Sequence, residues 1–457
     1  MKKPDRTGRL VPRKLILAGF FFNPQGNHRI SWRHEKAPDH EVFSLDYYAD
    51  LAREAERAKL DFIFLADHMA IWSGARSSVR HYANPRLEPI TLLSALAAVT
   101  RDIGLVSTAS TSYSEPYNLA RLFASLDHLS AGRAAINIVT SAMAEEAQNY
   151  GHGDVFAHGD RYRRAEEYVR VLRALWDSWE DEALLFDRAS GDFADETRVH
   201  ALDHEGEFFK VRGPLNVPRP PQGHLPVFQA GSSSDGKDFA ARHVDVQFVS
   251  LRSIEDALSY RADMNARLAK AGRDPAELIV LQGLQPVVAG SRAEAEDRFA
   301  HLQALQPDRL SLDLLSAWSG VDLDGVDPDG PMPPLPEAEG YKGVQTTLER
   351  VRLHAAKGLS VIEIARTMSA GGEMQFVGGT PREIADDIEA WFTSGAVDGF
   401  NLMFPHLPGD WTDFTGKVVP ELQRRGLFQR EYGPGTLRER LGLAPAPNLF
   451  RPALAAE

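Results

Sequence analysis

The 457-residue chain contains no cysteine. This absence excludes disulfide bonds, thiolate metal sites, iron–sulfur clusters and cysteine nucleophiles. Long apolar runs are also missing. The first apolar stretch, residues 15–22, is too short to span a membrane, and no small-residue cleavage pattern follows it. We therefore expect a soluble, cytoplasmic protein with no membrane partner.

Positive charge is scarce, since the formal net charge is -13. A surface that binds nucleic acid needs an excess of lysine and arginine, so nucleic acid is not an expected partner. A local cationic pocket for an anionic ligand remains compatible with this total.

Several motifs of metal and hydrolytic enzymes are absent as well. The sequence has no H-E-x-x-H, and no H-x-H follows the first predicted strand. His152, Asp154, His158 and Asp160 match no known ligand spacing, so no metal site is expected. No G-x-S-x-G elbow supplies a nucleophile, and no paired carboxylates suggest a glycosidase. Difficult chemistry in such a chain would require an organic cofactor.

The sequence does contain a regular alternation of short apolar runs and helical patterns. This alternation predicts parallel strands joined by right-handed crossovers. Eight such units favour a closed (β/α)8 barrel, the TIM-barrel architecture, over an open doubly wound sheet with a second domain. The predicted strands cover residues 14–22, 61–68, 102–111, 134–139, 225–231, 244–250, 277–290 and 397–405.

Three stretches interrupt this alternation within a predicted single domain of residues 1–457. Residues 181–224 are interpreted as an inserted hairpin with a proline-rich connector. Residues 309–343 are interpreted as an irregular excursion over the active site, because one more strand–helix unit follows them. Residues 426–457 form a C-terminal extension whose end we expect to wrap on a partner subunit or to be disordered.

Residues 132–170 combine a buried strand, a loop of about 17 residues and a helix start, an arrangement typical of a functional site. A second feature is AGSSSDG, residues 230–236, where a Gly/Ser turn opens a helix. Such a turn either binds a phosphate or simply caps the helix. Arg161 and Tyr162, at another helix start, favour the phosphate. Hydroxyl, amide and aromatic groups at the other strand ends suit a mononucleotide such as a flavin.

Several long motifs resemble the bacterial luciferase-like superfamily of flavin monooxygenases. They include FLADH, LVSTASTSYSEPYNLARLFASLDHLSAGRAAINIVTS, HGDRYRRAEEY and AGSSSDGKDFAA. Within that superfamily they are similar to the nitrilotriacetate monooxygenase component A branch, which also holds dimethyl-sulfide, dibenzothiophene-sulfone, EDTA and long-chain-alkane monooxygenases. The similarity runs from about Lys14 to about Arg425.

The resemblance implies a barrel with insertions and a two-component reaction. A separate NAD(P)H:flavin reductase would supply reduced FMN, and oxygen would add to it as a peroxyflavin that oxygenates a small organic substrate. The motifs carry five FMN contacts over to this chain: Asp67, Thr108, His158, Tyr162 and Ser233. Plausible additional contacts are Asn137, Thr140, Ser141 and Ser232.

The substrate side is implied less sharply. The family places aromatics and a histidine after the first strand, which points to Phe21, Phe22 and His28, with Trp32 and His34 nearby. We predict His28 as the catalytic acid or base, because histidine titrates near neutrality. Phe248 and residues 309–343 would cover the flavin.

The substrate could be an organosulfur compound, an aminopolycarboxylate or an alkane-like molecule. Two other functions remain open: a deazaflavin-dependent oxidoreductase of the same superfamily, and a non-catalytic flavin-binding barrel. A homodimer or homotetramer is also expected.

Overall fold

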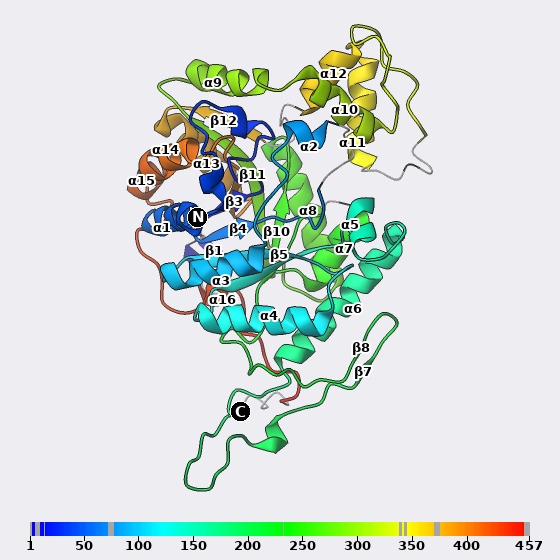
Figure 1. The fold of residues 1–457 in the computed structure, drawn as a ribbon. Helices are drawn as coiled ribbons and strands as arrows, with labels where there is room; N and C mark the ends of the chain where they lie inside the picture. Colours follow the sequence, from blue (N-terminus) through cyan, green and yellow to red (C-terminus); the bar gives the residue numbers. More distant parts are fainter. Residues whose placement is uncertain are drawn as a thin grey trace.

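The protein folds around a closed barrel, seen in a computed structural model (Figure 1). The structure describes residues 2–4, 10–12, 14–71, 77–231, 233–337, 341, 345–369 and 375–451. Within them, eight parallel strands pair in the order β10-β9-β6-β5-β4-β3-β13-β11, and β10 pairs with β11 to close the ring. These strands are β3 (Ile16–Phe21), β4 (Phe62–Leu65), β5 (Gly104–Ser110), β6 (Ala134–Val139), β9 (Val227–Gln229), β10 (Val246–Val249), β11 (Ile279–Val288) and β13 (Gly399–Leu402). The predicted TIM barrel is confirmed.

Helices surround the barrel as the alternation predicts. The surrounding helices are α1 (Leu45–Arg57), α3 (Pro89–Val99), α4 (Pro116–Leu129), α6 (His158–Trp176), α7 (Ser234–His243), α8 (Ile254–Lys270), α13 (Pro381–Ser394), α14 (Gly409–Asp413) and α15 (Val419–Arg424). Their apolar faces and the outward strand side chains form one large core cluster. Inward residues such as Phe20, Phe64 and Phe228 fill the barrel itself. The barrel is therefore a packed core, and its functional groups lie where the strands end.

Residues 309–319, predicted as irregular, belong instead to a helix. This helix is α10 (Asp308–Ser319), followed by α11 (Gln345–Ala356) and α12 (Val361–Ser369). These helices have a small core of their own, which includes Leu315, Val351 and Ile364. We call α10 to α12 the lid, since they sit above the barrel's carboxyl-terminal end (Figure 1). The Pro- and Gly-rich stretch conceals the helix before it, and residues 338–340 and 342–343 of the predicted excursion lie outside the described residues.

The helix predicted to complete the seventh unit does not stand in the barrel wall. This helix, α9 (Arg292–Ala304), packs on β12 (Gln375–Gly379), which extends β11 beyond the barrel. The wall position belongs to α13, which contacts α8 and α15. Because β11 is ten residues long, its second half pairs with β12 above the ring. The chain then builds the lid before it returns to β13.

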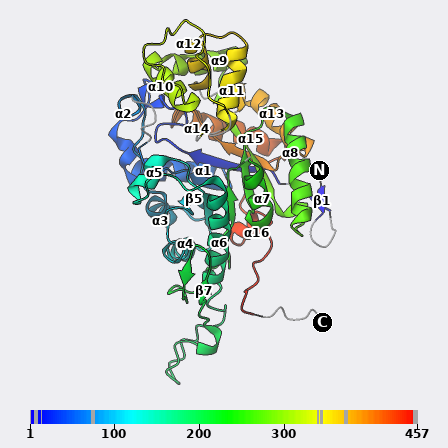
Figure 2. The same cartoon turned by 90° about the vertical axis from the view of Figure 1, so that its right-hand side faces the viewer.

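The insertion at residues 181–224 projects away from the barrel end opposite the lid (Figure 2). It contains the predicted hairpin, as β7 (His204–Glu205) and β8 (Lys210–Val211) pair antiparallel. Asp177, fully buried at the end of α6, accepts a hydrogen bond from Arg219 on Oδ1 at 2.9 Å. Its Oδ2 accepts the backbone N–H of Leu449 at 3.0 Å and lies 2.7 Å from His224 Nε2. The insertion thus shares an anchor with the C-terminal segment.

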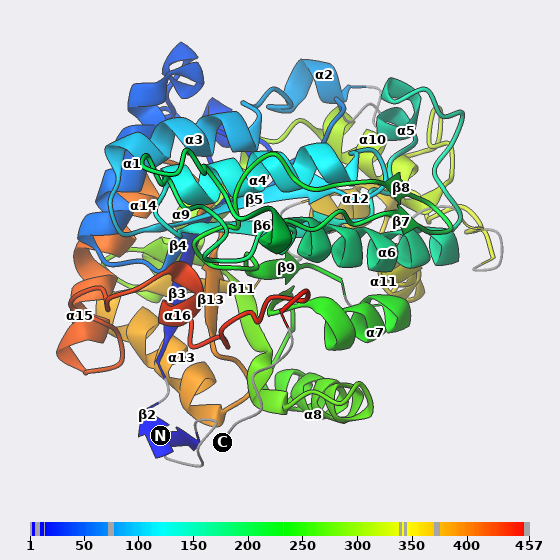
Figure 3. The same cartoon turned by 90° about the horizontal axis from the view of Figure 1, so that it is seen from below.

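The C-terminal segment packs on its own chain as far as Phe450, whose ring stacks on that of His200. Contact of its end with a partner subunit stays a prediction. Short helix α16 (Leu437–Arg440) lies across the lower opening of the barrel (Figure 3). Its Leu437, with Leu441 and Leu443, joins the core inside the barrel. The tail therefore closes the end of the barrel opposite the lid, and residues 452–457 lie outside the described part of the chain.

The remaining described elements are short. They are β1 (Lys2–Pro4), β2 (Leu10–Pro12), α2 (Ser78–His81), α5 (Ala144–Asn149), and the single turns Ser31–Arg33, His40–Phe43, Glu196–Arg198, Pro275–Glu277 and Phe414–Val418. No helix in the described ranges has both the length and the apolar character that a membrane crossing requires.

Candidate active site

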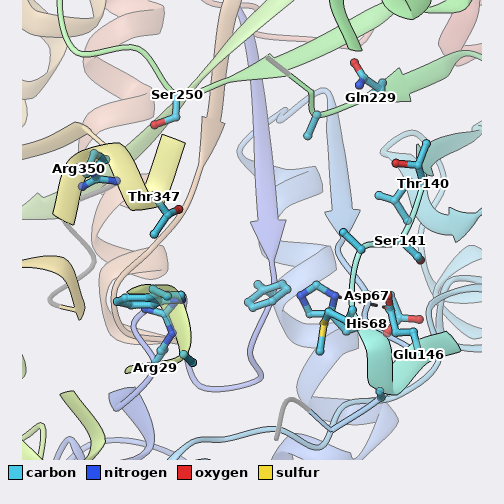
Figure 4. A pocket seen from close by; sticks show the side chains of 18 of the residues that line it. Arg29, Asp67, His68, Thr140, Ser141, Glu146, Gln229, Ser250, Thr347 and Arg350 are labelled. Carbon is cyan, nitrogen blue, oxygen red and sulfur yellow. Dashed lines mark ion pairs between the residues drawn. The ribbon is translucent and has the colours of Figure 1, made fainter. Parts of the chain in front are cut away.

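A large cavity lies between the carboxyl ends of the barrel strands and the lid. Its volume is about 1270 Å³. A pocket for one small molecule usually measures about 300–1,000 Å³, so this cavity has room for two. Two sides face each other across it in Figure 4. One carries Asp67, His68, Thr140, Ser141 and Glu146 from the barrel, and the other carries Arg29, Thr347 and Arg350 from the lid and the loop below it.

The barrel side has a polar floor. Inside the barrel mouth, the Asn137 side-chain amide donates to the Thr108 hydroxyl at 3.0 Å. The amide oxygen Oδ1 of Asn137 is buried without a hydrogen-bond partner. A buried acceptor without a partner is costly, so this atom is a candidate acceptor for a polar group above the barrel.

Ser141 begins the loop after β6 in a strained conformation, with φ of +40°. Its hydroxyl lies 2.9 Å from that of Ser110, and Arg161 donates to its carbonyl at 2.9 Å. These contacts hold a backbone shape that costs about 1–3 kcal/mol. The contacts keep this part of the cavity wall in one conformation. This is consistent with the prediction that residues 132–170 belong to the site.

The predicted phosphate residues come together at the start of α7. Ser233 caps this helix by accepting the Gly236 N–H at 3.1 Å, and the Tyr162 hydroxyl lies 3.5 Å from its Oγ. The His158 ring lies 5.1 Å from that of Tyr162, and its Nδ1 is 3.2 Å from Asp235. A Cβ added at Gly236 would stand 2.9 Å from the Tyr162 hydroxyl. Bare backbone, two hydroxyls and a helix N-terminus therefore form one cradle, while Ser232 lies outside the described residues.

The two remaining predicted contacts differ in their access to the cavity. Asp67 lines it, and burial raises the pKa of its carboxyl while Arg86 opposes that rise. Thr108 is only 7 % exposed and does not appear in the cavity lining; it supports the side chain of Asn137. The structure thus places Asp67 in the cavity wall and Thr108 one layer below it.

His28 is not brought into the cavity lining. The loop after β3 folds back onto β13, where the His28 N–H donates to the Pro405 carbonyl at 3.3 Å. Its ring packs edge-on against Phe299 and is 2 % exposed. Burial, with a smaller effect of Arg29, lowers its pKa to about 3. The acid/base role of His28 stays a prediction. In the structure its ring is buried and packed against other side chains.

His68 lies at the end of the second predicted strand, but its sequence context alone gave it no catalytic role. It lines the cavity directly after β4, its ring meets Phe22 edge-on at 5.1 Å, and its Nδ1 is 3.8 Å from Glu146. Glu146 is buried and also accepts the Met69 N–H at 3.0 Å. Although burial acts against it, these hydrogen bonds lower the pKa of Glu146. The sequence Ala66-Asp67-His68 places this histidine at the end of a predicted strand. Glu146 is 78 residues further along the chain, so only the fold shows that the two side chains are neighbours.

Of the other aromatic and histidine candidates, some line the cavity and others are packed outside it. Phe22 lines the cavity, with Arg86 stacked 4.5 Å from its ring centre. Phe21 packs on Trp411 in the core, and His34 packs on His406 at 4.0 Å, both outside the cavity lining. Phe248 packs on Phe20 in the barrel mouth, below the lining. In the described part of the chain, no three histidine or acidic side chains gather as a metal cluster would require.

Comparisons with known proteins agree with this arrangement. The chain matches the family model "Luciferase-like monooxygenase" over residues 27–398. It is 45 % identical to nitrilotriacetate monooxygenase component A of Aminobacter aminovorans over 95 % of this chain and 98 % of that protein. It is 41 % identical to N-acetyl-S-(2-succino)cysteine monooxygenase of Bacillus subtilis, covering 96 % and 99 %.

A solved structure gives the same result for the fold. The crystal structure of DmoA from Hyphomicrobium sulfonivorans superposes with a TM-score of 0.83 at 32 % identity, covering 94 % of this chain and 92 % of that chain. The family match spans most of the barrel, and the sequence relatives span nearly the whole chain. The chain therefore belongs to the luciferase-like monooxygenase family and is a flavin-dependent monooxygenase.

Proposed function

We propose that this chain is the oxygenating component of a two-component monooxygenase that uses reduced FMN. The main support is the cradle at the start of α7, where the hydroxyls of Tyr162 and Ser233 lie 3.5 Å apart beside Gly236 and the helix N-terminus, and Tyr162 lines the cavity. The cradle suits the single terminal phosphate of a mononucleotide. Phosphate binding there would lead the ring system of FMN over the barrel mouth.

The barrel side offers groups that fit the flavin ring. Unpartnered Oδ1 of Asn137, just below the cavity lining, would accept a hydrogen bond, and Gln229, which lines the cavity, would add another amide. Asp67 would lie beside the ring, and His158 would lie near the phosphate. When bound, reduced FMN would supply two electrons and activate O2, so that one oxygen atom enters the substrate and the other leaves as water.

The protein's own contribution is to position the reactants, exclude water and handle protons. Phe22 and Trp318 present apolar surface from the two sides of the cavity. His68 is the histidine we propose to exchange a proton with the reacting groups, since it lines the cavity and its Nδ1 lies 3.8 Å from the Glu146 carboxylate. The lid would shield the reaction from solvent.

A separate NAD(P)H:flavin reductase is the partner we propose. The relative from Aminobacter aminovorans is named component A, which implies a second component in that system. This chain would receive reduced flavin by transient contact or diffusion. Its cytoplasmic location and assembly into a homodimer or homotetramer stay predictions.

Two measurements test the proposal. Anaerobic titration should show tighter binding of reduced FMN than of a reduced deazaflavin, and the purified protein should change the rate at which oxygen reoxidises reduced FMN. If reoxidation proceeds identically with and without the protein, the proposal fails. Preferential deazaflavin binding would favour the deazaflavin alternative, for which the distant structural neighbours show a common fold alone, as with a 16 % identical F420-dependent alcohol dehydrogenase.

A further inference from the structure

The lid side of the cavity is strongly cationic, although the chain as a whole carries a charge of -13. Its lining cations are Arg29, from the loop after β3, Arg252, after β10, and Arg350 and Lys357, from α11. Among the described lining residues from the lid and these two loops, none is an aspartate or glutamate. The lining carboxylates, Asp67, Glu145 and Glu146, all belong to the barrel side.

These cations act on a common region of the cavity. His354, which also lines the lid side, has its pKa lowered mainly by burial and further by Lys357, Arg350 and Arg252. Arg29 stands on the loop after β3, and its guanidinium carbon lies 5.1 Å from the centre of the Trp318 ring on α10. In Figure 4, Arg29 and Arg350 lie on the same side of the cavity, across from Asp67 and His68. Four basic groups and a histidine therefore produce a concentrated positive potential.

Such a wall discriminates between substrate classes. An alkane or a neutral sulfide would displace water from this cationic wall and bring no negative charge to it, which is unfavourable. A carboxylate matches the guanidinium fork and can accept two parallel hydrogen bonds. Cations on three separate elements would suit a molecule with more than one carboxylate, and Trp318 and Leu251 would cover its carbon skeleton.

We propose that the lid side is the substrate site and that it selects a small organic anion with two or more carboxylates, bound by Arg29, Arg252 and Arg350. This inference rests on the proposed function, because the substrate must lie opposite the flavin on the barrel side. Arg29, Arg252 and Arg350 are then the residues that determine specificity, and two of them come from elements outside the lid.

The test is calorimetric binding of propane-1,2,3-tricarboxylate to the full-length protein, with the neutral triamide as the matched ligand. The tricarboxylate should bind, the triamide should not, and added NaCl should weaken binding. Arg350→Gln should weaken binding at least tenfold, Arg252→Gln should do so several-fold, and Arg350→Lys should lose less than Arg350→Gln. Arg352→Gln, on the same helix but outside the cavity lining, is the control and should bind normally.

Equal binding of the triamide, or unchanged binding by both Arg350→Gln and Arg252→Gln, would overturn the proposal. Thermal unfolding identifies any arginine variant that has lost its fold. In that case Lys357→Gln, at an exposed helix end that also lines the cavity, replaces it. Titration of the same proteins with reduced FMN separates this proposal from the broader one. Tricarboxylate binding without FMN binding would refute the flavin function only. FMN binding without tricarboxylate binding would refute the substrate class only.

Discussion

The two sides of the cavity are built in different ways. On the barrel side, functional groups stand at strand ends and are held by several contacts each, as Ser141 is by Ser110 and Arg161. On the lid side, Arg350 and His354 stand on a helix of the lid, which has a separate small core, and Arg29 and Arg252 stand on loops that follow barrel strands. A rigid scaffold suits a step common to the whole family, whereas an inserted lid can change its lining without disturbing the barrel. The difference indicates that cofactor and substrate recognition are separable in this chain.

The largest expected effect comes from filling the phosphate cradle. Gly236→Val would place side-chain atoms against Tyr162 and Ser233, since even a Cβ would stand 2.9 Å and 3.1 Å from their hydroxyl oxygens. Reduced-FMN affinity should fall at least about 100-fold, as phosphate contacts are charge-assisted, while tricarboxylate binding should persist. The control is Gly159→Ala on α6, where a Cβ meets nothing within 4 Å. Equal loss of both ligands would contradict the separation of the two sides.

The next largest effect separates two histidines. His68→Gln should lower kcat about tenfold to 100-fold and alter its pH profile, because His68 lines the cavity and general acid–base groups contribute about that much or more. His28→Gln should leave kcat within about twofold and lower the melting temperature instead, since the ring is buried and packed. Steady-state assays and thermal unfolding of both variants measure this. A large kcat loss for His28→Gln alone would restore the sequence-based prediction.

A smaller effect is expected at the hydroxyl of Tyr162. Tyr162→Phe removes one donor beside Ser233 and keeps the ring that packs near Phe239. Affinity for reduced FMN should fall by about 1 kcal/mol, or roughly fivefold, with no change for the tricarboxylate. Anaerobic fluorescence titration measures it, and unchanged FMN affinity would argue against phosphate binding in the cradle.

The smallest effect is a pH dependence on the lid side. The pKa of His354 lies below its ordinary value of 6.5, so the free protein holds this ring neutral near pH 7. A bound anion favours the protonated ring, so binding takes up a proton and affinity rises as pH falls through the range near and below 6.5. Ethane-1,2-disulfonate, whose charge does not titrate there, should bind about two- to threefold tighter at pH 6 than at pH 8. His354→Gln should remove this dependence, and a dependence that survives in that variant must come from another group.

Much of the barrel could be predicted because its signal is local. Alternating apolar strands and amphipathic helices repeat along the chain, and each repeat obeys the same packing rule. The cradle could also be predicted, since AGSSSDG carries both the turn and the N-cap in consecutive residues. The lid helices were harder to predict because Pro- and Gly-rich residues lie between them, and α9 has the same local pattern as a wall helix.

The site residues also differ in whether a local pattern or the course of long loops brings them together. Ser233 and Tyr162 meet because strand-end and helix-start positions of neighbouring units converge in any barrel. His28 lies near a strand end too, yet the loop folds onto β13 and buries it. The pairing of His68 with Glu146, and the gathering of Arg29, Arg252 and Arg350 around one cavity, join residues that are far apart in the chain.

The sequence by itself determined the barrel, the family and the hydroxyl-rich cradle, because these depend on patterns within a few residues or a repeated unit. The tertiary structure alone decided which histidine lines the cavity, where the tail closes the barrel and which cations face the barrel mouth. Those features depend on the course of long loops and on packing between distant segments, whose free energies arise only when the chain is folded.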